Sequence, residues 1–343
     1  MFGVLTAIAA IIAFVATFLL GYVIIPLMHK LKYGQTILEI GPKWHKKKQG
    51  TPTMGGIMFI FGIAIALLTT MPLVNIIGSD QLRSQLADQY YLTSLIAGLA
   101  LAVSMSLIGF IDDYIKVVKK QNLGLTAKQK TFFQMLVCAA YLTSMYLGGM
   151  TFTKIPFIGA VDITHGIGLL FWPIALIFIY GFTNAVNLTD GVDGLATAVT
   201  IISAIFFALI SVLSSVNNAV SGYLSVVFAA ALLGFLIWNK NPAKIFMGDT
   251  GSMFLGGMVV ALVFMTEYPI LLIFSGIVYL CEALSVVIQV AYFKKTRKRL
   301  FKMSPIHHHF ELSGWGEKKI DYIFSFVGAV GGLISMALIV FGQ

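Results

Sequence analysis

Ten long apolar stretches divide the chain, separated by short polar connections. A helix needs about 20 apolar residues to cross the hydrocarbon core of a bilayer, and all ten stretches approach that length except the eighth, which is short. Only helices and closed barrels satisfy their backbone hydrogen bonds inside lipid, so the pattern predicts an all-α polytopic membrane protein with about ten transmembrane helices. The stretches cover approximately residues 3–28, 53–74, 91–111, 131–149, 166–183, 195–212, 222–238, 252–266, 270–293 and 322–341.

Composition supports this fold class. Of the 343 residues, 58% are hydrophobic and only 11% are charged, whereas soluble domains carry about 25% charged residues. The sequence has no long linker, low-complexity tract or internal repeat, so we expect a single integral membrane domain over residues 1–343. Cys138 and Cys281 both lie inside apolar stretches, and we interpret them as small core residues rather than as metal ligands.

The basic residues predict how the chain is oriented. Of the 23 Lys and Arg residues, 21 fall in the first, third, seventh and ninth connections, and only Arg83 and Lys154 fall elsewhere. Short loops rich in Lys and Arg stay in the cytoplasm, so both termini are expected on the periplasmic or extracellular side. The basic inner face also accounts for the net charge of +9 without nucleic acid as a partner.

Five aspartates stand where apolar stretches meet the predicted cytoplasmic face: Asp112, Asp113, Asp190, Asp193 and Asp249. Asp112 can form a helix-end ion pair with Lys116, four residues later, but this leaves the adjacent acid unexplained, because acids at a helix C-terminus oppose the dipole. Asp249 either caps the following helix or belongs to an anion site at its start.

A shared cleft for these carboxylates would require a cation. Two like charges about 4 Å apart repel by roughly 4 kcal/mol at an effective dielectric constant near 20, so several carboxylates together demand protonation or a bound metal. Oxygen ligands beside a phosphate favour Mg²⁺ or Mn²⁺ over zinc. We therefore predict a divalent metal in an acidic site ringed by the lysines of the first and third connections.

Other polar residues have two interpretations. The segment 184–195 carries Asn or Asp at every third position up to Asp193, which is more than one helix cap requires and favours a polar lining. The consecutive histidines 307–309 point in different directions, so hydrogen bonding to an anionic substrate is favoured over zinc. The basic run 294–302 binds either anionic lipid head groups or substrate. Glu282 lies within the ninth stretch, where charge is costly; it is either protonated or faces a polar groove.

Together, the segments 50–56, 112–116, 184–195, 246–252 and 305–311 resemble the phospho-N-acetylmuramoyl-pentapeptide transferase (MraY) family of bacterial cell-wall synthesis. The family is a branch of the polyprenyl-phosphate N-acetylhexosamine-1-phosphate transferase superfamily, and the triple histidine is particular to it. The resemblance implies a ten-span bacterial inner-membrane enzyme, usually a homodimer, whose active site faces the cytoplasm. Such an enzyme moves phospho-MurNAc-pentapeptide from UDP-MurNAc-pentapeptide to undecaprenyl phosphate, giving lipid I and UMP with Mg²⁺ as cofactor.

The resemblance also implies roles for individual residues. Asp112, Asp113 and Asp249 are expected to be catalytic, with Asp249 as the Mg²⁺ ligand and the other two handling the lipid phosphate. The expected substrate-binding residues are Phe246, Lys116 and Asp193 at the uracil, Asn187 and Asp190 at the adjoining nucleoside and sugar, Lys48 and Thr53 near the phosphates, and His308 and His309 near the muramoyl-peptide.

Two other functions stay open. A related transferase that uses UDP-N-acetylglucosamine would share most of these motifs. An ion-coupled transporter would give Glu282 a central role, but transporters usually bind their substrates near the bilayer midplane, whereas five of the six candidate acids lie at the ends of the stretches. The sequence also leaves open whether transfer is direct or passes through an aspartyl-phosphate.

Overall fold

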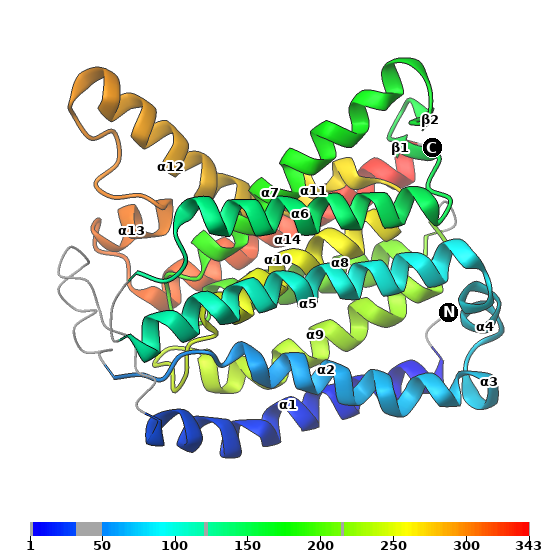
Figure 1. Cartoon of the computed structure of the whole chain (residues 1–343), viewed down its shortest axis with the longest axis horizontal. Helices are drawn as coiled ribbons and strands as arrows, with labels where there is room; N and C mark the ends of the chain where they lie inside the picture. Colours follow the sequence, from blue (N-terminus) through cyan, green and yellow to red (C-terminus); the bar gives the residue numbers. More distant parts are fainter. Residues whose placement is uncertain (1–2, 32–49, 120–122, 214–215, 343) are drawn as a thin grey trace.

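The computed structural model is a bundle of long helices, and it describes residues 3–31, 50–119, 123–213 and 216–342 (Figure 1). With η denoting 3₁₀ turns, the elements are α1 (Val4–Lys30), α2 (Gly56–Thr70), η2 (Met71–Leu73), α3 (Val74–Ile77), α4 (Asp80–Ala87), α5 (Gln89–Val118), α6 (Ala127–Leu147), β1 (Phe152–Ile155), β2 (Gly159–Asp162), η3 (Gly166–Leu170), α7 (Phe171–Thr189), α8 (Leu195–Ser211), α9 (Ala219–Asn239), α10 (Gly248–Met265), η4 (Pro269–Leu271), α11 (Leu272–Ser275), α12 (Ile277–Thr296), α13 (Ile306–Glu311) and α14 (Glu317–Phe341).

The prediction of a mostly helical membrane protein is confirmed. Each of the ten apolar stretches contains a helix, and 8 helical segments among the described residues are long and apolar enough to cross a membrane. The other two stretches contain α6, whose first turn is polar, and α8, which is apolar but has only 17 residues. Both termini lie at the same end of the bundle (Figure 1).

Three local features differ from the prediction. The ninth stretch does not form one helix: it is divided into η4, α11 and α12, and the ring of Phe182 packs so closely against Gly276 at the last break that a Cβ there would lie 2.5 Å from it. A short antiparallel hairpin, β1 and β2, follows α6. Cys138 is buried as expected, but Cys281 is exposed on α12, so the interpretation of Cys281 as a core residue is wrong.

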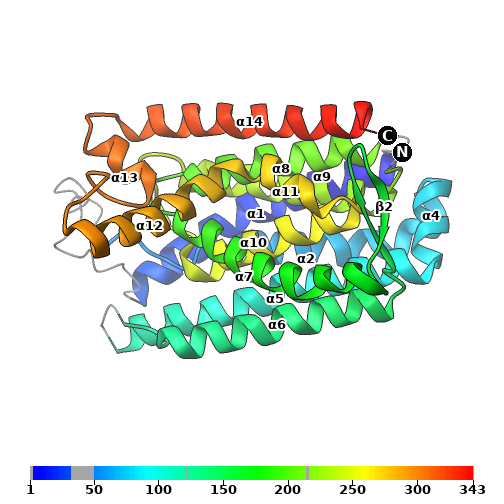
Figure 2. The ribbon, with the colours of Figure 1, turned by 90° about the horizontal axis from the view of Figure 1, so that it is seen from above.

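Helix α10 is the centre of the bundle. Seen from above, α14 and α6 lie at opposite edges with α10 between them (Figure 2), and 89% of the α10 span is buried. Small residues let α5 pack against it: a Cβ added to Gly98 would lie 2.8 Å from Ala261, and one added to Gly257 would lie 2.7 Å from Ala102. Close packing of this kind holds helices together where lipid provides no hydrophobic driving force.

Candidate active site

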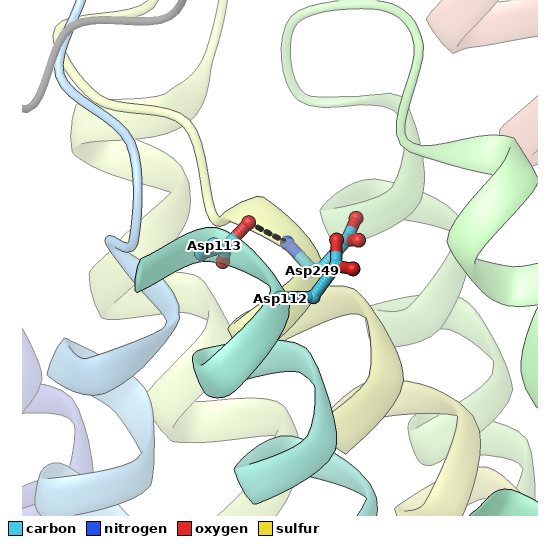
Figure 3. A group of neighbouring side chains, drawn as sticks. All are labelled: Asp112, Asp113 and Asp249. Atoms are coloured by element: carbon cyan, nitrogen blue, oxygen red, sulfur yellow. Dashed lines mark hydrogen bonds between the residues drawn. The ribbon is translucent and has the colours of Figure 1, made fainter. Parts of the chain in front are cut away.

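Three of the predicted aspartates converge at one end of the α5–α10 pair. Asp112 and Asp113 lie near the C-terminus of α5, and Asp249 lies in the first turn of α10 (Figure 3). One carboxylate oxygen from each can be chosen so that all three atoms lie within 4.8 Å of one another. The helix α5 continues to Val118 rather than ending at these acids, so the pair projects from a rigid helix and not from a loop.

Asp113 holds the start of α10. Its carboxylate accepts hydrogen bonds from the backbone N–H of Asp249 at 3.2 Å and from the backbone N–H of Thr250 at 2.9 Å, and it accepts a third from the Thr250 hydroxyl at 2.7 Å. The first N–H groups of a helix have no partner within that helix. A carboxylate of α5 therefore caps a neighbouring helix and fixes the backbone that carries Asp249.

Two lysines and one amide surround the Asp249 carboxylate. Lys116 Nζ lies 3.1 Å and Lys130 Nζ lies 2.9 Å from Asp249 Oδ2, while the Asn187 side chain donates to Oδ1 at 2.9 Å. Lys116 also lies 2.5 Å from Asp112, so the ion pair that the i, i+4 spacing allows is present. Four helices, α5, α6, α7 and α10, thus meet at one carboxylate.

Lys130 was predicted only as a member of the lysine ring, and the structure shows why it reaches the site. Thr126 and Gln129 form a reciprocal capping box that starts α6 at Ala127, which places Lys130 in the first helical turn. A capping box is readable from sequence, but the partner of the lysine is not. Ser252, which accepts a 2.7 Å hydrogen bond from Asn187, was not predicted at all.

Glycines allow the backbones to meet at the site. A Cβ on Gly109 would lie 2.1 Å from the carbonyl oxygen of Asp249, and one on Gly124 would lie 2.3 Å from Asp112 Oδ1. The backbone next to Gly124 also donates to Asp112, from the N–H of Leu125 at 2.7 Å. Side chains at these two positions would separate the elements that carry the aspartates.

The segments that carry Thr53 and Phe246 lie side by side. The N–H of Phe246 donates to the carbonyl of Pro52 at 2.9 Å, and the N–H of Gly55 donates back to Phe246 at 2.8 Å. Thr53 is buried, and its hydroxyl lies against Gly248, whose φ of +70° suits a residue without a side chain. Lys48, also predicted near the phosphates, lies outside the described residues.

Asp190 lies beside the cluster. It ends α7, and packing around its carboxyl raises its pKa well above the usual value, with a further rise caused by the negative charges of Asp249, Asp113 and Asp193. A cation among these groups would relieve the repulsion. The structure therefore brings the predicted Asp190 close to the three aspartates without a direct hydrogen bond between them.

Asp193 and the histidines have other neighbours. Asp193 is buried and accepts from the backbone N–H of Ala243 at 2.9 Å, in the connection before α10. His308 pairs with Glu311 at 2.6 Å, and His309 accepts from the backbone N–H of Lys302 at 3.1 Å. The structure does not bring these side chains into direct contact with the aspartate cluster.

Glu282, the residue on which the transporter interpretation depended, has a partner. Its Oε2 atom lies 3.1 Å from Nδ1 of His307, and both side chains are buried. Among the described residues its other oxygen, Oε1, has no hydrogen-bond partner, so the contact with His307 is what explains the position of Glu282 within α12. The interpretation as an ion-coupled transporter therefore loses its main support.

The donor set fits a hard divalent cation. The cluster offers only carboxylate oxygens, the ligands that Mg²⁺ and Mn²⁺ prefer, and their spacing allows one atom from each aspartate to face a common ion. Lys116 and Lys130 compensate part of the negative charge at Asp249. The site thus combines carboxylates for a metal with ammonium groups for an anion such as a phosphate.

Comparison with known proteins first gives the class. Residues 95–267 match the model of glycosyl transferase family 4, so the chain is a membrane transferase whose matched region contains the aspartate cluster. Residues 48–60 match the phospho-N-acetylmuramoyl-pentapeptide-transferase signature 1.

Curated relatives then give the particular family. A phospho-N-acetylmuramoyl-pentapeptide-transferase of Staphylococcus carnosus (strain TM300) is 46% identical over 334 residues, covering 95% of this chain and 97% of the relative. Those of Staphylococcus aureus (strain JH9) and Clostridium perfringens (strain SM101 / Type A) are 44% and 43% identical, covering 95% and 96% of this chain and 97% and 95% of the relatives. The chain belongs to the phospho-N-acetylmuramoyl-pentapeptide-transferase family, as the motifs predicted.

Proposed function

We propose that this protein transfers phospho-MurNAc-pentapeptide from UDP-MurNAc-pentapeptide to undecaprenyl phosphate, forming lipid I and UMP in the first membrane step of peptidoglycan synthesis. The observation that carries the proposal is the meeting of Asp112, Asp113 and Asp249 with Lys116 and Lys130 at the ends of their helices. One substrate is confined to the lipid and the other to water, so the reacting atoms must meet at the membrane surface. The ends of membrane-spanning helices, where these aspartates and lysines lie, are at the membrane surface.

Charge neutralisation is the main requirement of such a site, because a pyrophosphate repels an attacking phosphate and phosphoryl transfer depends largely on positioning and electrostatics. When bound, Mg²⁺ would neutralise pyrophosphate oxygens and polarise the bond that breaks. Asp249 is the proposed Mg²⁺ ligand, and the carboxylate of Asp112 lies beside it. Lys116 and Lys130 supply positive charge for the phosphates, and Lys48 and Thr53 are proposed to bind phosphate next to them.

The acceptor phosphate needs to be deprotonated to attack. The second pKa of a phosphate monoester lies near 6, so Asp112 and Asp113 have a modest role, which is to keep a proton away from the attacking oxygen. Asp113 also holds the first turn of α10, so the same residue positions Asp249. These roles are those of a direct transfer; in a two-step transfer one of the aspartates would instead attack the sugar-linked phosphate, release UMP and be freed again by attack of the prenyl phosphate.

The nucleotide-sugar would lie along the loops next to α7 and α10. Asn187 donates to Asp249, and Asp190 adjoins it; both are proposed to face the nucleoside and sugar. Phe246, which is half-buried just before α10, is proposed to hold the uracil together with Lys116 and Asp193. His308 and His309 on α13 are the proposed contacts for the muramoyl-peptide.

We also propose that residues 1–343 form one domain that crosses the bacterial inner membrane ten times. Both termini would lie outside the cytoplasm and the active site would face the cytoplasm. The enzyme is proposed to work as a homodimer. The concentration of Lys and Arg in the odd-numbered connections supports this orientation. The basic run 294–302, which begins in the last turn of α12, supports contact with anionic membrane lipids, since Lys294, Arg297 and Arg299 line a cavity of about 510 Å³ together with apolar side chains.

UMP release tests the function. Purified protein in detergent receives UDP-MurNAc-pentapeptide, and we expect UMP and lipid I only when undecaprenyl phosphate and Mg²⁺ are both present. Asp249→Asn should abolish the reaction while its melting temperature stays close to that of the parent protein. UMP formed without undecaprenyl phosphate, or full turnover in Asp249→Asn, would refute the proposal. Equal or faster turnover with UDP-N-acetylglucosamine would assign the chain to the related transferases instead.

A further inference from the structure

Glu282 makes a buried connection between two helices that the proposed reaction does not use. It lies on α12 with no exposed surface, and it meets His307, in the first turn of α13, which is also fully buried. The carboxylate Oε2 lies 3.1 Å from the imidazole Nδ1 and accepts from the backbone N–H of His307 at 3.4 Å. A buried carboxylate is costly unless it is paired, so this contact fixes how α13 sits on α12.

The other edge of the His307 ring reaches the polar segment between α7 and α8. A Cβ added to Gly191 would lie 2.2 Å from Nε2 and 2.7 Å from Cε1 of His307, so the ring packs directly against the Gly191 backbone. Within the described part of the chain, neither ring nitrogen makes a hydrogen bond, and Nδ1 has only its close contact with Glu282. Packing, rather than hydrogen bonding, therefore transmits the position of the imidazole to this segment.

The segment that His307 supports carries proposed substrate-binding residues. Gly191 directly follows Asp190 and lies four residues after Asn187, which donates to Asp249. Helix α13 is also held to α14 by Phe310, whose ring stacks on Trp315, just before α14, at 4.5 Å and meets Phe324 edge-on at 5.9 Å. Contacts with both α12 and α14 thus fix the position of α13, and with it the imidazole that packs against Gly191.

We infer that Glu282 is a positioning residue for the nucleotide-sugar site: through His307 it sets the backbone at Gly191 and thereby the placement of Asp190 and Asn187. The inference deepens the proposed function and rests on it. Glu282 touches neither substrate. Its loss alters the binding of the UDP-sugar, whereas the prenyl phosphate, bound near Asp112 and Asp113, is unaffected.

Steady-state kinetics of two variants test this. Glu282→Leu removes the partner of His307, and Glu282→Gln keeps its shape and one acceptor. We expect the KM for UDP-MurNAc-pentapeptide to rise about tenfold in the leucine variant, because small misplacements of binding groups cost this much or more. The rise should be smaller in the glutamine variant. The KM for undecaprenyl phosphate should change less than about twofold.

A matched control separates positioning from general damage to α12. Ser285 is buried one turn later and its hydroxyl donates to the carbonyl of Glu282, so Ser285→Ala disturbs the same helix without touching α13. We expect its KM values to equal those of the parent protein. A merely structural role for Glu282 would lower the amount of active enzyme in the leucine and glutamine variants and leave KM unchanged, and that result would overturn the inference.

Hydrogen exchange gives a readout that does not depend on turnover. In Glu282→Gln, the peptide covering residues 187–194 should exchange faster than in the parent protein, while the peptide covering residues 106–113 should not change. If the parent protein releases no UMP, the proposed function fails, and the exchange experiment still decides whether Glu282 holds this segment. Unchanged exchange at residues 187–194 would overturn the inference.

Discussion

Asp113 near the end of α5 accepts two hydrogen bonds from Thr250 in the first turn of α10, one from its backbone N–H at 2.9 Å and one from its hydroxyl at 2.7 Å. These bonds connect the two helices that carry the candidate catalytic carboxylates. The position of Asp249 relative to Asp112 therefore depends on Asp113 as well as on the packing of the helices.

Thr250→Val should reduce turnover about tenfold, the equivalent of ~1.4 kcal/mol in the barrier, because the valine keeps the N–H but removes the hydroxyl that holds Asp113. Thr197→Val is the matched control, since Thr197 is also buried and donates to Asn239 at 2.7 Å away from the aspartates. Each variant should lose about 1 kcal/mol of stability. Initial rates and melting temperatures check this; equal rates in the two variants would contradict it.

Lys130→Met should lower turnover about 100-fold, near the effect of removing one preorganised charge contact from an active site. The half-saturating Mg²⁺ concentration should fall, because Asp249 no longer has an ammonium group 2.9 Å away. Lys128→Met is the control: Lys128 is exposed on the same helical turn. A Mg²⁺ titration of UMP release measures both quantities, and a higher Mg²⁺ requirement in Lys130→Met would count against the assignment.

Gly109→Ala should inactivate the enzyme and destabilise it by about 1–3 kcal/mol, the usual cost of overpacking. The added Cβ would lie 2.1 Å from the Asp249 carbonyl oxygen, so α5 and α10 must move apart. Gly181→Ala on α7 is the control, because a Cβ there meets nothing within 4 Å; alanine at a helical glycine position gains up to about 1 kcal/mol. Parallel activity and thermal-shift assays test both, and an active Gly109→Ala would show that the helices need not touch there.

Asp190→Asn should raise the melting temperature at pH 8 by a few degrees and have no effect near pH 4. The pKa of Asp190 in the folded protein is raised by burial and by neighbouring carboxylates. As the pH rises from about 4, the Asp190 carboxyl therefore ionises in the unfolded chain before it ionises in the folded protein. The free energy of unfolding of the parent protein therefore falls as the pH rises toward the pKa of Asp190 in the folded state. The asparagine variant has no carboxyl at this position and does not show this loss. Asp80→Asn, at an exposed position on α4, is the control. The measurement is a series of melting curves between pH 5 and pH 8. The prediction is contradicted if the difference in melting temperature between Asp190→Asn and the parent protein does not grow with pH.

The sequence by itself determined the helical membrane class and the local contacts. Apolar stretches of about 20 residues must form helices in lipid, where no water satisfies the backbone, so the long helices could be located in advance, whereas short helices such as α4 and α13 could not. The ion pair between Asp112 and Lys116 followed from helical periodicity alone. The break at Gly276 did not, because it depends on the ring of Phe182 from another helix.

Tertiary structure decided which polar groups meet. Lys130 and Asp249 are 119 residues apart, and Glu282 and His307 belong to different helices; their contacts depend on the rotation and tilt of each helix in the bundle. Those angles are set by how side chains interdigitate along the whole interface, at positions such as Gly109 that have no chemistry of their own. A motif can therefore name the aspartates, but only the packing of α5, α6, α7 and α10 makes them one site.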